Sequence, residues 1–299
     1  MDRRSDKRAG AISPDRPSHP ETVALPEDHP GFSDTEYRAR RAAIAEVART
    51  YESGHPIPRV AYAPEEDALW ALVSRELRAK HEQYACAEYL AATDRLALRS
   101  DRVPQLGQVT GRLEWLTGFR LEPVPGLVPT RTFYAALAER RFLSTQYIRH
   151  HSVPFYTPEP DVVHELVGHA NMLASPMFAA LYQAAGCASR RAHTDAALEF
   201  FSRVFWFTLE FGVVWERGEL RAYGAGLLSS FGELEVFRDA ETRPLDIVEM
   251  GTLDYDITRY QPVLFAAATF NEIVDVAGAF FESFDDEVAE RLTAARPAS

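Results

Sequence analysis

Two histidines set five residues apart are the side chains of this sequence best suited to metal chemistry. His164 and His169 lie in an apolar helical pattern, and Glu210 lies in the next long helical pattern. Two imidazoles and one carboxylate on one ion leave half of an octahedron open, which is the ligand set of mononuclear non-haem Fe(II) oxygenases. These residue types therefore predict an iron site at which O₂ and a reductant can meet.

A zinc hydrolase is the first alternative, because Glu165 directly follows the first histidine. The zinc motif His-Glu-x-x-His sets its histidines four residues apart on one helical face. Five residues of an ideal α-helix turn through about 500°, which leaves the two side chains about 140° apart. Both can reach one ion only where the helix distorts or ends, and Gly168 marks the position for that. The spacing disfavours a zinc hydrolase.

Glu210 is the carboxylate that the apolar pattern singles out. It stands in the run Phe-Trp-Phe-Thr-Leu-Glu-Phe at 205–211, where no solvated helix face would accommodate it. A carboxylate among aromatic side chains is costly unless it is paired or bound to a metal. The other histidines are weaker candidates, because Arg149 adjoins His150 and His151, and the rest lie in the tail, in loops or at positions expected to be exposed (His19, His29, His55, His81 and His193).

Composition excludes several classes of protein. The formal net charge of −12 argues against a nucleic-acid or anionic-membrane partner. The sequence contains no run of 18 apolar residues, the length that a membrane-spanning helix needs. Its first residues lack the apolar stretch of a secretion signal. Cys86 and Cys187 are too few for a disulfide framework. We therefore expect a cytoplasmic protein whose ligands are small molecules.

The elements that must position these residues are mostly helical. Residues 1–31 are rich in Pro, Asp, Arg and Ser and predict a mobile tail, which leaves 32–299 as a single catalytic domain. Short β-like segments occur at 119–124, 142–149, 220–223 and 262–265, with a hairpin turn at Arg217-Gly218. The fold class expected is mostly α with minor β ribbons. Helical patterns cover 33–51, 64–81, 84–97, 104–117, 130–139, 159–168, 176–185, 195–213, 228–237 and 271–281.

Four segments in order resemble the catalytic domain of pterin-dependent aromatic amino acid hydroxylases. They are residues 147–150, 157–169, 205–212 and 222–234, and the resemblance extends from about residue 104 to about 281. Because 299 residues leave no room for the regulatory and tetramerisation segments of the animal enzymes, the chain is similar to the short bacterial phenylalanine hydroxylases (phenylalanine 4-monooxygenases). The fold implied is a single domain of this hydroxylase type.

The resemblance implies a monooxygenase reaction and its cofactors. Fe(II) would be held by His164, His169 and Glu210, and tetrahydrobiopterin or a related reduced pterin would be the reductant. The implied reaction is hydroxylation of the ring of L-phenylalanine with O₂, giving L-tyrosine. A pterin-recycling dehydratase is then a candidate partner, and we expect a monomer or small oligomer.

On the substrate side, the resemblance implies that Arg149 clamps the carboxylate of the amino acid through a two-point contact. Glu159 or Asp161 would hold that guanidinium in place. Thr157 and Ser229 would bind the polar end of the substrate. Pro160 and Trp206 would pack against its aromatic ring.

On the pterin side, the resemblance implies that Phe133 stacks on the cofactor. Backbone groups of Gly126 and Leu127 would contact its polar edge, and Glu165 would lie near the same ring. One departure from the family is Phe205, which stands where a tyrosine is usual. The missing hydroxyl lies near the iron in relatives, so its loss could change coupling or the ring position that is hydroxylated.

Several alternatives remain open. Phe205 keeps open a phenylalanine 3-hydroxylase that makes meta-tyrosine. A tryptophan 5-hydroxylase is disfavoured by Trp206, where that branch tends to carry phenylalanine, and a tyrosine hydroxylase by the apolar Ile257 at an acidic position. A non-catalytic metal-binding module would leave Arg149 unexplained.

Overall fold

The computed structural model describes residues 25–257 and 259–295. Most of the predicted tail, residues 1–24, lies outside the described residues. Leu25 and His29 are nonetheless buried, and helix α1 (Pro30–Ser33) follows them directly. Packed structure therefore includes seven residues that the prediction assigned to the tail.

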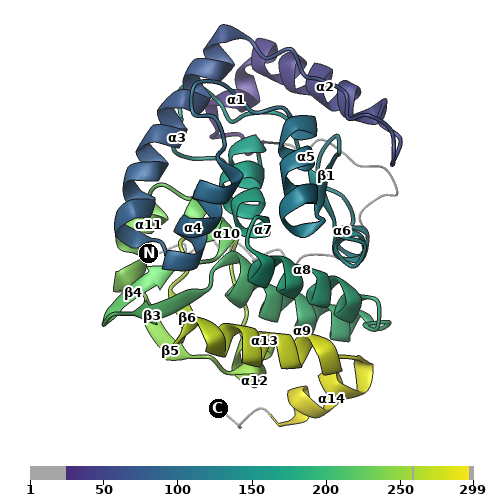
Figure 1. Ribbon diagram of the computed structural model, residues 1–299, viewed down its shortest axis with the longest axis vertical. Helices are drawn as coiled ribbons and strands as arrows, with labels where there is room; N and C mark the ends of the chain where they lie inside the picture. Colours follow the sequence, from purple (N-terminus) through teal and green to yellow (C-terminus); the bar gives the residue numbers. More distant parts are fainter. Residues whose placement is uncertain (1–24, 258, 296–299) are drawn as a thin grey trace, which may run out of the picture.

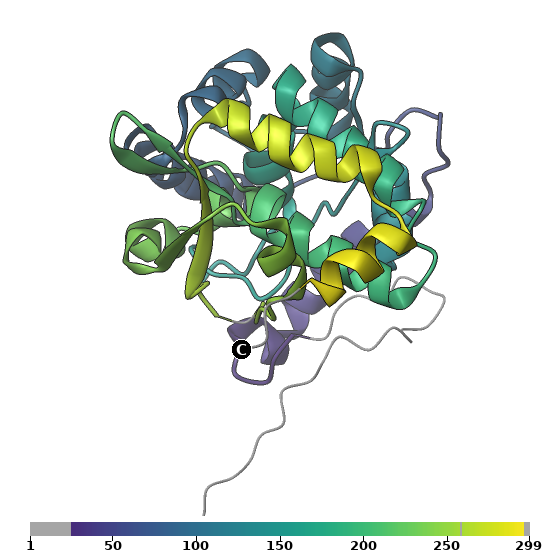
Figure 2. The same ribbon diagram turned by 90° about the horizontal axis from the view of Figure 1, so that it is seen from below.

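Helices form most of the described chain, as the periodicity predicted. Figure 1 shows the N-terminal helices on one side of the molecule, and α13 and α14 lie with the larger sheet on the other. Figure 2 shows α13 and α14 crossing the face seen from below. The α-helices are α2 (Thr35–Arg49), α3 (Pro64–Tyr84), α4 (Ala87–Leu96), α5 (Leu106–Thr117), α6 (Thr130–Leu137), α7 (Asn171–Leu173), α8 (Pro176–Ser189), α9 (Asp195–Phe205), α10 (Ala225–Ser229), α11 (Glu233–Val236), α12 (Ile247–Thr252), α13 (Phe270–Ser283) and α14 (Asp286–Ala294).

Local signals explain where several helices begin and end. Asp34 accepts a hydrogen bond from the Tyr37 N–H at 2.9 Å, which caps α2. Pro64 occupies the first turn of α3, where its missing N–H costs nothing. Gly118 ends α5 with a φ of 78°, in the left-handed region that glycine adopts without strain. Such signals depend only on near neighbours and were therefore visible in the sequence.

Two small sheets complete the fold. Strands β1 (Arg120–Pro123) and β2 (Arg141–Ser144) form a parallel pair. The larger sheet has the order β4-β3-β6-β5, with strands β3 (Val213–Glu216), β4 (Glu219–Ala222), β5 (Glu241–Pro244) and β6 (Val263–Ala267). Arg217 and Gly218 have φ values of 54° and 80° and form the β3–β4 hairpin turn that the sequence predicted. The predicted fold class is confirmed.

The predicted strand 142–149 is wrong beyond Ser144, where β2 ends. The residues that follow pair with side chains and not with a strand: the Thr145 N–H donates to Glu165 and the Arg149 N–H donates to Asp161. Carboxylates here take the place of a ladder partner. The extended segment is thus tied directly to the residues predicted to form the site.

Three predicted helices are also divided differently. The helix expected at 159–168 begins only at Val162 and changes type at His164. The helix expected at 195–213 ends at Glu210, and the one at 228–237 is split into α10, α11 and a 3₁₀ turn, Phe237–Asp239. The short elements α12, α14 and β5 were not predicted. Within the described residues, no helix is both long and apolar enough to cross a membrane.

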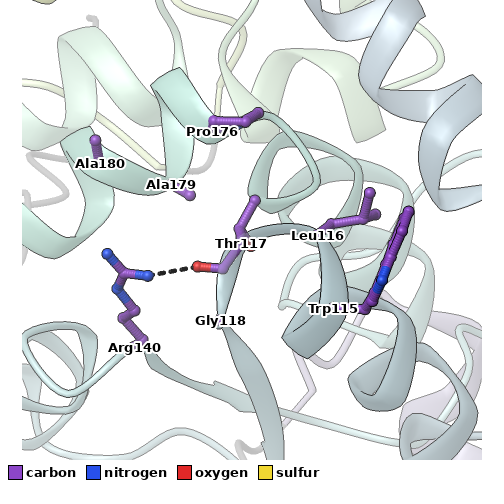
Figure 3. A pocket seen from close by; sticks show the side chains of 8 residues that line it. All are labelled: Trp115, Leu116, Thr117, Gly118, Arg140, Pro176, Ala179 and Ala180. Atoms are coloured by element: carbon purple, nitrogen blue, oxygen red, sulfur yellow. Dashed lines mark hydrogen bonds between the residues drawn. The ribbon is translucent and has the colours of Figure 1, made fainter.

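A surface cavity of about 310 Å³ lies away from all the predicted site residues. Figure 3 shows Arg140 at its edge, donating to the Thr117 carbonyl, with Trp115 on the opposite side. The other residues that line it are Leu116, Gly118, Pro176, Ala179 and Ala180. Because it contains no cluster of acid, base or metal-binding groups, this cavity does not identify the active site.

Candidate active site

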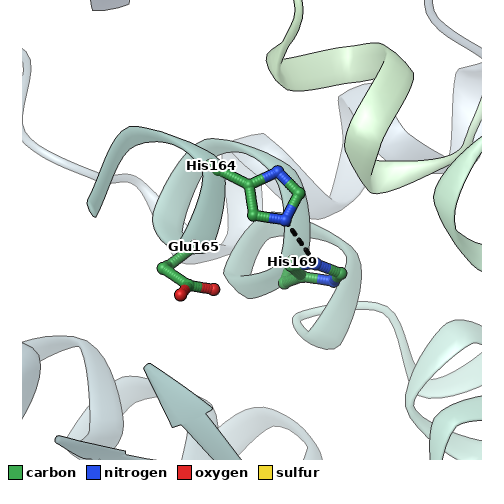
Figure 4. A group of neighbouring side chains, drawn as sticks. All are labelled: His164, Glu165 and His169. Atoms are coloured by element: carbon green, nitrogen blue, oxygen red, sulfur yellow. Dashed lines mark hydrogen bonds between the residues drawn. The ribbon is translucent and has the colours of Figure 1, made fainter. Parts of the chain in front are cut away.

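His164 and His169 lie on a π-helix, His164–Ala170. In a π-helix the backbone bonds run from residue i to i+5, so side chains five residues apart come close to the same face. The two Nε2 atoms are 3.0 Å apart, and Figure 4 shows the imidazole rings turned toward each other. The distortion that the spacing required is therefore a widening of the helix, which continues past Gly168 into α7.

Glu210 ends a second π-helix, Trp206–Glu210. The Phe211 N–H donates to the Trp206 carbonyl at 2.8 Å, the i to i+5 bond of this helix type. The Glu210 Oε1 atom lies 3.2 Å from His169 Nε2. Two separate π-helices thus bring the three predicted ligands together.

The separations between these atoms are short enough for one metal ion. At a metal–ligand distance of about 2.1 Å, neighbouring ligands lie about 3.0 Å apart around an octahedron and about 3.4 Å apart around a tetrahedron. The observed values, 3.0 and 3.2 Å, lie within this range. Burial lowers the pKa of His164 to about 4, which keeps the imidazole neutral, as a ligand must be. The residues present therefore fit a bound metal ion.

Glu165 is a second carboxylate near the histidines, and its ligand atoms and theirs lie within 4.8 Å of one another. Its Oε1 atom already accepts hydrogen bonds from the Thr145 N–H at 3.1 Å and the Thr145 hydroxyl at 3.0 Å. Burial raises the pKa of Glu165 to about 7. Because Glu210 reaches His169 Nε2 directly, we assign Glu210 and not Glu165 as the third ligand.

Each histidine is oriented through its other ring nitrogen. His164 Nδ1 lies 2.8 Å from the Ser229 hydroxyl, and His169 Nδ1 lies 2.7 Å from the Tyr182 hydroxyl. Such partners fix the ring so that Nε2 faces the ion. Ser229, predicted to bind substrate, contacts one of the predicted metal ligands. Tyr182 was missed, because a tyrosine in the apolar pattern of α8 looks like an ordinary core residue.

Helix α10 brings Ser229 to His164 by lying very close to the first π-helix. A Cβ atom on Gly168 would lie 2.7 Å from the Ala225 carbonyl oxygen, so a larger residue there would push α10 away. Gly224 is in similar contact with the second π-helix, since a Cβ there would lie 2.3 Å from the Glu210 carbonyl oxygen. These two glycines allow one short helix to brace both metal-binding segments.

Arg149 is buried and is held by Asp161. Its Nε and Nη2 atoms donate to the two carboxylate oxygens at 2.9 and 2.8 Å. The Arg149 guanidinium keeps the pKa of Asp161 below its usual value, although burial acts to raise it. Glu159, the other candidate, pairs with Arg41 instead. On the other edge of the guanidinium, Nη1 donates to the Pro154 carbonyl at 3.5 Å.

The remaining predicted substrate contacts are Thr157 and Pro160, outside helices and strands, and Trp206, at the start of the second π-helix. The Thr157 hydroxyl donates to the Glu159 carbonyl at 3.0 Å, and the Pro160 carbonyl accepts from Thr145. The Trp206 indole stacks on Tyr255 with ring centroids 4.3 Å apart. Ile257 is 58% exposed. The structure thus places Ile257 on the surface, outside any enclosed apolar slot.

The comparison with known families covers most of the chain. The model of the biopterin-dependent aromatic amino acid hydroxylases matches residues 20–292. This chain belongs to that family. The predicted family and enzyme class are therefore confirmed.

Among curated members, a phenylalanine 3-hydroxylase from Streptomyces coeruleorubidus is 48% identical over 87% of this chain and 93% of its own length. The tyrosine 3-monooxygenase of Mus musculus is 47% identical over 83% of this chain and 51% of its own. Phenylalanine-4-hydroxylase of the same species is 44% identical, again over 83% of this chain, and over 56% of its own length. The chain thus spans about half the length of these animal hydroxylases.

Solved hydroxylase structures from Chromobacterium violaceum share the fold. Its phenylalanine hydroxylase bound to cobalt aligns with a TM-score of 0.74 at 29% identity, covering 84% of this chain and 92% of that one. The same enzyme with iron(III) and 7,8-dihydrobiopterin aligns at 0.72 and 32% identity, covering 79% and 85%. The predicted cofactor pair, iron and a pterin, is the pair present in that relative.

The pterin side of the hydroxylase site is aromatic in this structure. Phe133 packs edge-on against Phe142 with centroids 5.4 Å apart, and Phe142 lies 4.6 Å from the His169 ring. Gly126 is buried and Leu127 is 37% exposed. Phe205 is buried, and its ring lies 5.9 Å from that of Tyr182, the residue that orients His169. The departure at Phe205 therefore lies one side chain away from the metal ligands.

Proposed function

We propose that this hydroxylase is an iron- and tetrahydropterin-dependent monooxygenase that hydroxylates the ring of L-phenylalanine with O₂. The observation that carries the proposal is the convergence of His164, His169 and Glu210, two imidazoles and one carboxylate, within the reach of one metal ion. The metal- and pterin-bound structures of the Chromobacterium violaceum enzyme support it.

The protein's own residues bind and orient the reactants. When bound, iron and reduced pterin supply the activation of O₂. Arg149 binds the substrate carboxylate through its Nη1–Nη2 edge, where the substrate replaces the Pro154 carbonyl, while Asp161 holds the Nε–Nη2 edge. Trp206 forms one wall for the substrate ring, and the pterin stacks near Phe133. Buried aromatic side chains around His169 exclude water from the space between the two molecules.

For the ring position, we propose carbon 3 ahead of carbon 4, so that the product is meta-tyrosine. The sequence alone favoured L-tyrosine as the product and kept meta-tyrosine as the alternative. Meta-tyrosine is now supported by the 48% identity to the phenylalanine 3-hydroxylase along 93% of that protein. Phe205 beside the metal-orienting Tyr182 also supports it. Hydroxylation at carbon 4 is the second candidate, favoured by the phenylalanine-4-hydroxylase of Mus musculus at 44% identity.

The test is anaerobic reconstitution with Fe(II), followed by O₂ uptake with a reduced pterin and phenylalanine, tryptophan or tyrosine. We expect phenylalanine to give the highest kcat/KM, and chromatography should show meta-tyrosine as the main product. Para-tyrosine as the main product would leave the substrate assignment intact and overturn the ring position. Higher kcat/KM for tryptophan than for phenylalanine would overturn the substrate assignment.

A further inference from the structure

One backbone carbonyl in the middle of the first π-helix receives two side-chain donors. The Val167 carbonyl accepts from the Tyr89 hydroxyl at 2.7 Å and from the Asn171 amide at 3.1 Å. The Asn171 amide also lies 3.2 Å from the Tyr89 oxygen, so the three groups form a closed set. Tyr89 comes from α4, far from this helix in sequence, and is completely buried.

The wide turn explains why this carbonyl needs an outside donor. In an α-helix, the Val167 carbonyl would accept from the N–H of the residue four positions on, which is Asn171. Here that N–H donates to the carbonyls of Leu166 and Gly168. A buried carbonyl that loses its regular donor is costly unless another group replaces it. Tyr89 and the Asn171 side chain provide that replacement.

We propose that Tyr89 is a positioning residue of the metal site, whose hydroxyl keeps the segment 164–170 in the wide turn that lets His164 and His169 face one ion. The inference rests on the proposed metal-binding function of those histidines. If the segment relaxed to an α-helix, the two side chains would again point about 140° apart. Metal affinity would then fall although every ligand is still present.

The contacts of Tyr89 show what its hydroxyl contributes. Burial raises the pKa of Tyr89, so the group stays protonated and remains a donor. Its ring packs edge-on against His81 with centroids 5.0 Å apart, a contact that phenylalanine would keep. Tyr89→Phe removes the donor to Val167 and, with the same oxygen, the contacts to the Asn171 amide at 3.2 Å and to His81 Nδ1 at 3.5 Å.

The experiment is a Co(II) titration of the full-length protein, followed by the visible absorption of the bound ion. We expect Tyr89→Phe to bind Co(II) about tenfold more weakly than the wild type, the effect typical of losing a group that orients metal ligands. Tyr62→Phe is the matched control, because the Tyr62 hydroxyl also donates to a backbone carbonyl, that of Gln146, at 2.7 Å. It should lose similar stability and keep wild-type affinity.

His164→Ala measured alongside separates two kinds of failure. Unchanged Co(II) affinity in His164→Ala would overturn the metal site itself. If His164→Ala loses Co(II) affinity but a folded Tyr89→Phe keeps the wild-type affinity, only the role of Tyr89 would be overturned. If Tyr89→Phe does not fold, Asn171→Ala removes the second donor to the same carbonyl and should weaken Co(II) binding in the same direction. Wild-type affinity in that variant would equally overturn the inference.

Discussion

The metal-binding half of the site and its substrate-binding half are completed in different ways. In the metal half, three ligand atoms already lie within 3.2 Å of a neighbour, and both histidines have a hydroxyl on their second nitrogen. In the predicted substrate half, the Thr157 hydroxyl bonds the Glu159 carbonyl of its own segment. The predicted metal ligands therefore converge in the folded chain, whereas this predicted substrate contact is turned toward its own backbone.

The difference follows from what each half must do. A metal site tolerates deviations of only a few tenths of an ångström in the positions of its ligand atoms. The predicted ligands accordingly lie on helices that pack closely against their neighbours. A substrate must enter and leave at every turnover, and two of its predicted contacts, Thr157 and Pro160, lie outside helices and strands. Trp206 and Ser229 lie on helices, and Asp161 fixes Arg149 on one edge.

The strongest test of the metal half is removal of a ligand. We expect His164→Ala, His169→Ala and Glu210→Ala each to abolish iron retention or turnover in a folded protein, because a three-ligand site cannot lose one ligand and keep its geometry. Iron content and O₂ uptake measure this. Near-wild-type activity at stoichiometric iron in any one variant would remove that residue from the site.

His81 supports the same half through its hydrogen bond to α10. Its Nε2 atom lies 2.7 Å from the Leu228 carbonyl, one residue before Ser229. Burial lowers the pKa of His81 to about 4 from 6.5, so the unfolded chain binds the proton first as pH falls. The contribution of neutral His81 to the free energy of unfolding is therefore fully present above pH 6.5. It falls by about 3 kcal/mol as the pH drops toward 4.

Urea unfolding of His81→Gln at pH 7 and pH 4.5 tests this linkage. Between pH 7 and pH 4.5, we expect the free energy of unfolding to fall by about 2 kcal/mol less in His81→Gln than in the wild type. An equal pH dependence in wild type and His81→Gln would show that His81 is not held neutral by burial.

The substrate half is tested first at Arg149. Lysine keeps the charge but cannot make the planar two-point contacts to Asp161 and to a carboxylate. In Arg149→Lys, the KM for phenylalanine should rise about tenfold or more, well beyond any rise for the pterin. Arg140→Lys, an exposed arginine at the distant cavity, should change neither constant. Equal changes in both constants would assign Arg149 to architecture and not to substrate capture.

The smallest effect is expected at Trp206. Its indole fills space that a tryptophan substrate would need, so Trp206→Phe should narrow the phenylalanine-to-tryptophan ratio of kcat/KM by about fivefold, or roughly 1 kcal/mol. Competition assays with both amino acids measure the ratio directly. An unchanged ratio would place Trp206 outside the wall of the substrate site.

The parts of the fold that the sequence predicted are those that depend on near neighbours. Apolar periodicity located α3 and α5, and the Arg217-Gly218 pair located the β3–β4 hairpin. The short elements α12 and β5 were missed, because a few residues carry too little periodicity to recognise. His81, expected to be exposed, is buried, since its helix packs α10 on the side that carries this residue.

Within the site, the sequence alone determined which residue types could hold a metal and that their spacing was incompatible with a regular α-helix. Only the tertiary structure decided that the helix widens and that Asp161 and not Glu159 holds Arg149. It also decided that the hydroxyls of Tyr182 and Ser229 contact the two histidines. Side-chain chemistry and spacing are properties of a short segment, whereas the choice between two equally suitable carboxylates depends on which one distant helices bring within hydrogen-bonding distance.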